Sequence, residues 1–332
     1  MNDLVALQNK AMEAIKKFQS IESFDDLELW LLNGRGLSQN TYKTYLEAVK
    51  QFYRYFEGLH PLQWTPAHIE KFYDHVREKN GISTAYNRIA GIKKICSNIK
   101  EQMPFWESPF DIMPESVQTK LKASEQGKKK KALYKKEARA VLEHLKADTT
   151  IKGQQNYAMV YTLLTTGLRA AELCNLHYGS IEHDPDNDIW YLTGIGKGNK
   201  PFHVEVYPEA VRAIHAAFKA RFKRDWKQGD FLFYSLENYH GKPPARMNKS
   251  TLWVRLRDIG NRLKADGLVR QEIEFSAHLF RRTFLTLLSK EGMRTVALQQ
   301  HSRHSNMSTL TNHYVDDTES TRPYLDKILG AA

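Results

Sequence analysis

Cysteine is scarce in this sequence of 332 residues, because only Cys96 and Cys174 occur and neither lies in a CxxC or Cys/His spacing. Such usage argues against a disulfide framework and against a zinc site, so we expect both to be reduced core residues. Long apolar runs are missing too, since nowhere do about 18 consecutive apolar residues occur. The sequence therefore predicts neither a signal peptide nor a membrane span, and it favours a cytoplasmic protein.

Positive charge is in excess, with a formal net charge of +11. Residues 1–120 hold 15 Lys plus Arg and 15 Asp plus Glu, so the whole excess lies in residues 121–332. A protein with this balance is expected to bind a polyanion, most simply nucleic acid. The densest run follows a Ser/Glu/Gln/Gly segment of linker composition and either stays solvated or binds a phosphate backbone. It consists of Lys128, Lys129, Lys130 and Lys131.

The first part of the chain has helical periodicity. Residues 38–57 place apolar side chains at alternating steps of three and four, which predicts a helix that Ser38 or Asn40 caps. Thr65 and Pro66 are typical of the start of a second helix, as the N-cap and the first helical residue. The pattern indicates a small all-helical unit.

A third helix of this unit is expected over residues 83–100, with Ser83 or Thr84 as its N-cap. Its basic side chains either contact DNA phosphates or form an ordinary solvated face. They are Arg88, Lys93 and Lys94.

The second part mixes helices with a hairpin. A helix is expected from about residue 135 to 146, and a strongly apolar helix after it is interrupted at Thr166-Gly167. The runs DNDIWYLTG and KPFHVEVY, rich in β-branched and aromatic residues, flank IGKGN and predict an antiparallel hairpin. Helical patterns return over residues 208–222, 250–263 and 278–292.

These patterns predict a fold that is mainly α (α+β). A length of 332 residues allows two domains with separate cores. We expect an all-helical domain over residues 1–118 and a basic linker over 119–131. Residues 132–332 form a mostly helical domain with a small antiparallel β-sheet and a C-terminal tail.

Two constellations in the second domain could act on an anion. TGLRAAEL puts Arg169 just after a glycine at the head of a helix, with Glu172 on the same face. An ordinary surface ion pair is the alternative. GIGKGNK puts Lys197 at the hairpin tip, where glycines let the backbone approach a ligand closely, or where the lysine is simply exposed. It is no Walker A loop, because Gly198 follows the lysine and a strand comes next.

Two further constellations lie near the C-terminus. HLFRR spaces His278 and Arg281 by three residues, which places them on one helical face, whereas Arg282 points elsewhere. A histidine beside an arginine is an unfavourable pairing unless an anion lies between them, so this spacing favours a phosphate site. RHSNMSTLTNHYV then carries His304 and Tyr314, ten residues apart.

These four constellations, in this order, resemble the tyrosine recombinase (phage integrase) family. The most specific matches are TTGLRAAELCNL, GKGNK and HLFRRTF, and the helix SQNTYKTYLEAVKQFYRYF is similar to the family's core-binding domain. The resemblance covers most of the chain and implies a catalytic set that falls, residue by residue, on this sequence. That set is Arg169, Lys197, His278, Arg281, His304 and the nucleophile Tyr314.

The chain departs from the family pattern at three places. The family usually separates its last histidine and tyrosine by nine residues, and that position here is His313. The usual glycine before the histidine is Arg303, and Arg282 stands where a second histidine is common. His301 is a rival for the role of His304, whereas Tyr324 lies too far past the motif to be the nucleophile.

The resemblance implies a chemistry for these residues. Tyr314 attacks a DNA phosphate and forms a 3′-phosphotyrosyl link, while Arg169 and Arg281 stabilise the transition state. His278 accepts the tyrosine proton and His304 binds a phosphate oxygen, or the two histidines exchange roles. Lys197 protonates the leaving 5′-oxygen. Neither ATP, a metal nor another cofactor is required.

The resemblance also implies partners. We expect a homo-tetramer on two double-stranded DNA recombination sites, with Lys200 of the hairpin as a further DNA contact and the C-terminal tail either exchanged between protomers or packed on its own subunit. We therefore expect the protein to act on the nucleoid. Two alternatives stay open, which are a type IB topoisomerase-like enzyme and a catalytically inactive DNA-binding relative.

Overall fold

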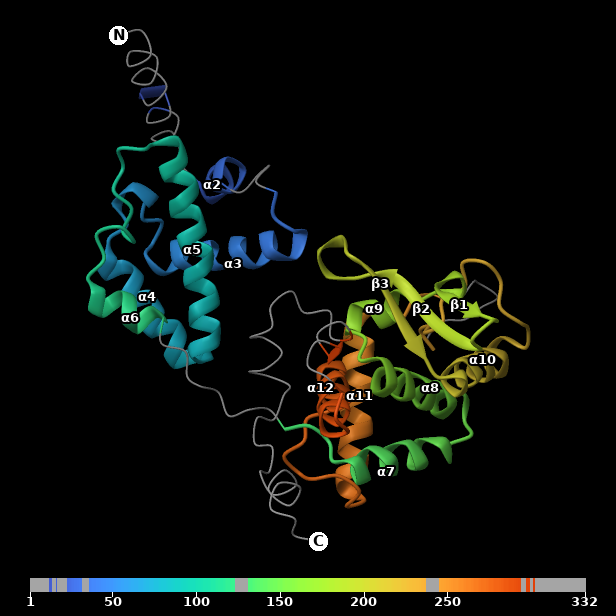
Figure 1. Cartoon of the computed structure of the whole chain (residues 1–332). Helices are drawn as coiled ribbons and strands as arrows, with labels where there is room; N and C mark the ends of the chain where they lie inside the picture. Colours follow the sequence, from blue (N-terminus) through green and yellow to red (C-terminus); the bar gives the residue numbers. More distant parts are fainter. Residues whose placement is uncertain are drawn as a thin grey trace, which may run out of the picture. The chain divides into compact units, whose positions relative to one another are not determined.

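A computed structural model describes residues 23–31, 36–122, 131–236 and 245–293, together with residues 12, 13, 16, 297, 298 and 301. These residues form two compact units, which divide between Lys128 and Lys129 (Figure 1). No helix of the described part is long and apolar enough to span a bilayer.

The first unit is helical, as the periodicity predicts. Its largest helices pack pairwise around aromatic residues, with Phe52 contacting both Trp64 and Phe72 edge-on. Ser38 caps α3 by accepting a hydrogen bond from the amide of Thr41 at 3.2 Å, which confirms the predicted cap. The elements are α2 (Phe24–Leu31), α3 (Gln39–Tyr55), the 3₁₀ turn η1 (Pro61–Gln63), α4 (Pro66–Asn80), α5 (Ile82–Gln102) and α6 (Glu115–Lys122).

The start of the third predicted helix differs from the expectation. Thr65 and Pro66 begin α4 as predicted, but α5 begins at Ile82 with Gly81 as its N-cap, so the prediction of Ser83 or Thr84 is wrong. The reason is that Gly81, at φ 82°, both ends α4 and starts α5, which a residue with a side chain rarely does. Residues 119–122, at the beginning of the predicted linker, belong to α6.

The second unit is mostly helical, with one core. Helix α8 is buried along most of its length, and α7, α10 and α12 pack against it. The predicted bounds of two helices, over residues 135–146 and 208–222, are those observed. The helices are α7 (Lys135–Lys146), α8 (Ile151–Thr166), α9 (Ala170–Asn175), α10 (Pro208–Phe222), α11 (Lys249–Ala265) and α12 (Ala277–Lys290).

A three-stranded antiparallel sheet, in the order β1-β2-β3, completes this unit (Figure 1). The predicted hairpin is formed by β2 (Ile189–Ile195) and β3 (Pro201–Val206). Along β3 the side chains alternate between solvent and core, as the sequence pattern requires. Strand β1 (Ile181–Asp184) is not among the predicted strands, because only one apolar residue occurs in IEHD.

Both cysteines are free and buried, as predicted. Burial raises the pKa of the Cys96 thiol to about 12 and that of the Cys174 thiol to about 11. Thiols with such values carry almost no thiolate at neutral pH, so these cysteines serve the cores rather than chemistry.

Candidate active site

The turn between α8 and α9 is the centre of the site. Helix α8 ends at Thr166, and Gly167 follows in the left-handed conformation at φ 61°. A Cβ at Gly167 would lie 2.7 Å from Cδ1 of Phe284 on α12. Glycine is therefore required twice, by its backbone conformation and by the closeness of α12. We call residues 167–169 the catalytic turn.

Arg169 ends this turn as the N-cap of α9. Its Nη1 lies 2.9 Å from Oε1 of Glu172, and its main-chain N–H donates to Oε2 of the same carboxylate at 2.8 Å. Glu172 is only 2% exposed, so the pair is not an ordinary surface ion pair. A buried carboxylate that accepts two hydrogen bonds holds the guanidinium in a defined place.

Arg281 reaches the same turn from α12. Its side chain is 1% exposed, and its Nη1 donates to the carbonyl oxygen of Gly167 at 2.5 Å. Ser276 fixes the start of α12 by accepting a hydrogen bond from the amide of Leu279 at 3.1 Å. Two arginines that lie 112 positions apart in the sequence thus meet at the catalytic turn.

The β2–β3 hairpin lies against Glu172. The N–H of Gly196 donates to the carbonyl oxygen of Lys200 at 2.7 Å and closes the hairpin base. A Cβ at Gly196 would be 2.8 Å from Oε1 of Glu172, so only glycine lets the strand end come this close. Lys197 follows directly, in a 3₁₀ turn, and its side chain is exposed, as is that of Lys200.

His278 lies one turn before Arg281 at the start of α12, and its side chain is exposed. The two share a spacing but not an environment, because the arginine points into the core. Arg282 points elsewhere, as predicted, and donates to the carbonyl oxygen of Lys131 at 2.9 Å. His301 is half-buried. His304, Tyr314 and Tyr324 lie outside the described residues.

The predicted DNA contacts fall on both units. Arg88, Lys93 and Lys94 lie on α5, and the Lys93 ammonium is 5.8 Å from the ring centroid of Phe110. Lys131 forms an exposed ion pair with Glu272 at 2.9 Å. Lys128, Lys129 and Lys130 lie outside the described residues.

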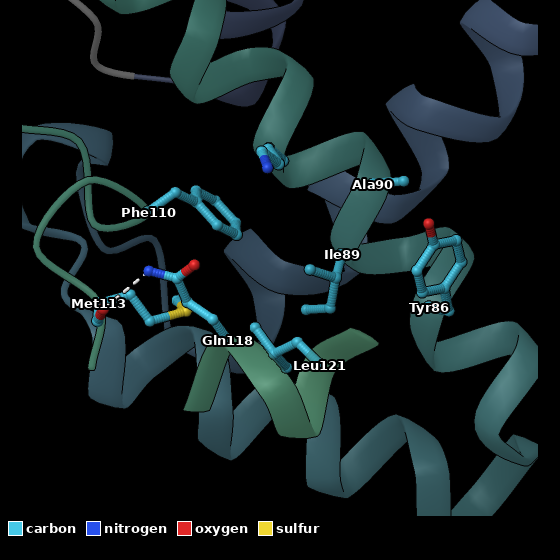
Figure 2. A pocket seen from close by; sticks show the side chains of 8 residues that line it. Tyr86, Ile89, Ala90, Phe110, Met113, Gln118 and Leu121 are labelled. Atoms are coloured by element: carbon cyan, nitrogen blue, oxygen red, sulfur yellow. Dashed lines mark hydrogen bonds between the residues drawn. The ribbon is translucent and has the colours of Figure 1, made fainter. Parts of the chain in front are cut away.

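The first unit also has an apolar pocket of about 190 Å³, beside Lys93 (Figure 2). It is lined by Ile89, Phe110 and Leu121, and Gln118 closes one side by donating to the carbonyl oxygen of Met113 at 3.0 Å. Among the described residues, no member of the predicted catalytic set lines it. Over the described part of the chain, no three His, Cys, Asp or Glu side chains are placed to hold a metal ion.

The contacts that support the site are not visible in the sequence. Glu172 is visible as a helix partner of Arg169, but its contact with Gly196 joins segments that no local pattern connects. Thr283, beside the two arginines of α12, accepts a hydrogen bond from the amide of Leu133 at 3.0 Å, also unforeseen. The only available signal was the run of glycines around Lys197.

Comparison with known families decides the assignment. The model of the phage integrase family matches residues 131–321, which is more than half of the chain. The chain belongs to the phage integrase family. The model of the phage integrase N-terminal SAM-like domain matches residues 27–102. Membership confirms the resemblance drawn from the motifs, and with it the prediction of a tyrosine recombinase enzyme.

Relatives of this phage integrase family member include proteins named tyrosine recombinases. It is 26% identical to tyrosine recombinase XerD of Halalkalibacterium halodurans over 83% of this chain and 86% of the relative. It is 30% identical to tyrosine recombinase XerC of Caldanaerobacter subterraneus subsp. tengcongensis, over 50% of this chain and only 43% of that protein.

Solved structures share the fold. The XerH recombinase bound to its palindromic difH substrate matches with a TM-score of 0.68 at 19% identity, over 97% of this chain and 88% of that chain. The Tn1549 transposon integrase with transposon right end DNA matches with a TM-score of 0.69 at 19% identity, over 92% of this chain and 99% of that chain. These matches confirm the predicted fold class.

Proposed function

We propose that this chain recombines DNA at specific sites by breaking and rejoining strands through a 3′-phosphotyrosyl intermediate at Tyr314. The observation that carries the proposal is the convergence of Arg169 and Arg281 on the catalytic turn. Planar guanidinium groups suit phosphate oxygens, and here two of them are held in place before substrate arrives.

The chemistry needs such a site. A tyrosine phenol has a pKa of about 10, so roughly one in a thousand is ionised at pH 7, a cost of about 4 kcal/mol. Positively charged side chains around the phosphate offset this cost by stabilising the negative charge that develops in the transition state. We assign His278 as the proton acceptor and His304 as a donor to a phosphate oxygen, with the reverse assignment as the variant.

The leaving 5′-oxygen needs a proton, which we assign to Lys197. Its place at an exposed hairpin turn, directly after the glycine that lies against Glu172, lets it approach a bound backbone. The tyrosyl ester keeps the energy of the broken bond, so a second DNA end can reverse the step. The reaction therefore needs neither ATP nor a metal ion.

Exchange of four strand ends requires four nucleophiles, so we propose a homo-tetramer on two sites, acting on the nucleoid. Relatives whose structures contain DNA, such as XerH with difH, support a duplex as the substrate. Phosphate contacts should dominate affinity and make it dependent on salt. We assign them to Arg88, Lys93, Lys94, Lys128, Lys129, Lys130, Lys131 and Lys200. The C-terminal tail would pass between protomers.

The test is to trap the covalent adduct. The DNA that flanks the gene for this chain is prepared as nicked duplexes, in which the strand end diffuses away after cleavage. Intact protein should form an adduct that denaturing gels resolve, and Tyr314→Phe should form none. Tyr324→Phe is the matched control and should behave like the intact protein.

The other outcomes separate the alternatives. Absence of an adduct from intact protein on every flanking duplex would support the inactive relative. Efficient relaxation, by a monomer, of a supercoiled plasmid without flanking DNA would support the topoisomerase. An adduct that persists in Tyr314→Phe but disappears in Tyr324→Phe would identify Tyr324 as the nucleophile.

A further inference from the structure

Three consecutive residues of α12 contact two separate parts of the second unit. Arg281 donates to the carbonyl oxygen of Gly167 at 2.5 Å. Arg282 donates to the carbonyl oxygen of Lys131 at 2.9 Å, and Thr283 accepts from the amide of Leu133 at 3.0 Å. Successive helix residues point about 100° apart, so these contacts lie around different sides of the helix. Helix α12 therefore joins the catalytic turn to residues 131–133, which we call the strap.

The strap is bound firmly because its main-chain groups are held by side chains. Leu133 is 2% exposed and Thr283 is 0% exposed, so their hydrogen bond is shielded from water. Breaking it would leave a buried N–H without a partner, which is costly in a folded protein. The nearby Arg270 donates to the carbonyl oxygen of Ala132 at 2.5 Å and so holds the next peptide group.

An ion pair anchors the end of the strap. Arg270 Nε lies 2.9 Å from Oε1 of Glu137, and the guanidinium carbon is 3.7 Å from the ring centroid of Tyr134. Burial raises the pKa of Glu137, but hydrogen bonds from Arg270 and from the Tyr134 and Arg270 amides outweigh it, so the pKa is lowered overall. The carboxylate therefore stays charged at neutral pH and keeps the anchor closed.

The strap is also where the linker enters. Residues 123–130, which lie outside the described residues, connect α6 covalently to Lys131, so the strap is where the chain from the first unit enters the second unit. Because Arg282 and Arg281 are neighbours on one rigid helix, a shift of the strap moves the guanidinium at the catalytic turn. Interfaces packed in this way tend to have discrete arrangements rather than continuous ones.

We propose that Arg282 and Thr283 are positioning residues that transmit the position of the linker to Arg281, so that cleavage is fast only when the strap is seated on α12. This inference rests on the proposed function, because its readout is DNA cleavage. It gives Arg282 a task other than binding the scissile phosphate, which would be the simpler use of an arginine beside the site.

Full-length Arg282→Ala, Thr283→Val and the double variant test it, by single-turnover adduct formation on nicked DNA at saturating protein. A small displacement of a catalytic group can cost about 100-fold, so each single variant should lose about 10- to 100-fold in cleavage rate. DNA affinity should stay within about twofold, and the double variant should be no slower than the slower single one. Arg282→Lys, which keeps a donor, should recover part of the rate.

Arg257→Ala is the control, because it also removes one exposed arginine charge from the second unit and lies on α11 over Trp253. It should cleave at the wild-type rate. Amide exchange of Leu133, measured without DNA, reports the strap directly and should speed up in Arg282→Ala.

Each remaining outcome overturns a defined part. If Arg282→Ala is slow while Thr283→Val cleaves normally, or if their effects multiply, Arg282 acts on DNA and the coupling is wrong. Unchanged exchange at Leu133 in Arg282→Ala would also overturn it, whatever the activity. If wild-type protein forms no adduct, the proposed function fails and the coupling falls with it.

Discussion

The catalytic turn and the β2–β3 hairpin place positive charge in opposite ways. At the turn, Arg281 is 1% exposed and bound to a main-chain carbonyl, and Arg169 is held by a buried carboxylate. At the hairpin, Lys197 and Lys200 are exposed. The difference follows the proposed roles, because charges that stabilise a transition state must be fixed in advance, whereas a proton donor must be able to reach its substrate.

Arg281→Lys should give the largest effect, because an ammonium lacks the planar donors that bind the Gly167 carbonyl and a phosphate together. Adduct formation should fall by about 100- to 1,000-fold, as when a donor to a developing oxyanion is removed. Urea unfolding should show a loss of about 1–3 kcal/mol. Arg257→Lys, on the solvent side of α11, is the control. Near-normal cleavage by Arg281→Lys would mean that burial of this arginine is only structural.

Lys197→Ala should slow cleavage by about 100-fold or more, the usual contribution of a general acid. Its melting temperature should not change, since the side chain is exposed. Replacing the leaving 5′-oxygen with sulfur should remove the defect, because a thiol has a pKa of about 8.5 and leaves without a proton donor. Lys219→Ala, an exposed lysine of α10, should be neutral. If the sulfur substrate does not rescue Lys197→Ala, the lysine is not the acid.

Gly196→Ala should have an intermediate effect, because the new Cβ would lie 2.8 Å from the Glu172 carboxylate and push the hairpin away from the turn. We expect cleavage to fall about tenfold and stability to fall by about 1–3 kcal/mol, the usual cost of overpacking. Gly267→Ala is matched to it, since that Cβ meets nothing within 4 Å although φ is 69°. It should lower stability alone. Equal cleavage rates for the two variants would show that the position of the hairpin does not affect cleavage at the catalytic turn.

Lys200→Ala should have the smallest effect. The side chain is exposed, so we expect a modest loss of DNA affinity and a salt dependence whose log–log slope is lower by about one. Fluorescence anisotropy on flanking duplexes from low to moderate salt measures both. An unchanged slope would show that the hairpin base touches no phosphate.

Local patterns predicted most of the helices. The bounds of α7 and α10, the break at Gly167 and the hairpin follow from periodicity and from glycine chemistry within a few residues. Local patterns did not predict the start of α5, because Gly81 both ends α4 and caps α5. They did not predict β1 either, because that strand is short and polar. Propensity carries too little information in such short segments.

Motif order could propose the residues of the candidate site but not their geometry. Motif order placed Arg169, Lys197 and Arg281 together, whereas the contact between Arg282 and Lys131 spans 151 positions and leaves no periodic trace. The contact of Gly196 with Glu172 is equally hidden. His304 and Tyr314 stay predictions, since they lie outside the described residues.

Glu172 has a consequence for turnover. Its buried carboxylate accepts two hydrogen bonds from Arg169, so one negative charge lies directly beside one of the two guanidinium groups at the catalytic turn. A recombinase must release the DNA after rejoining it, and a lower affinity for the phosphate at the cleaved position makes that release faster. Under the proposed function, we therefore expect this buried acid to speed release of the repaired duplex as well as to hold one guanidinium in place.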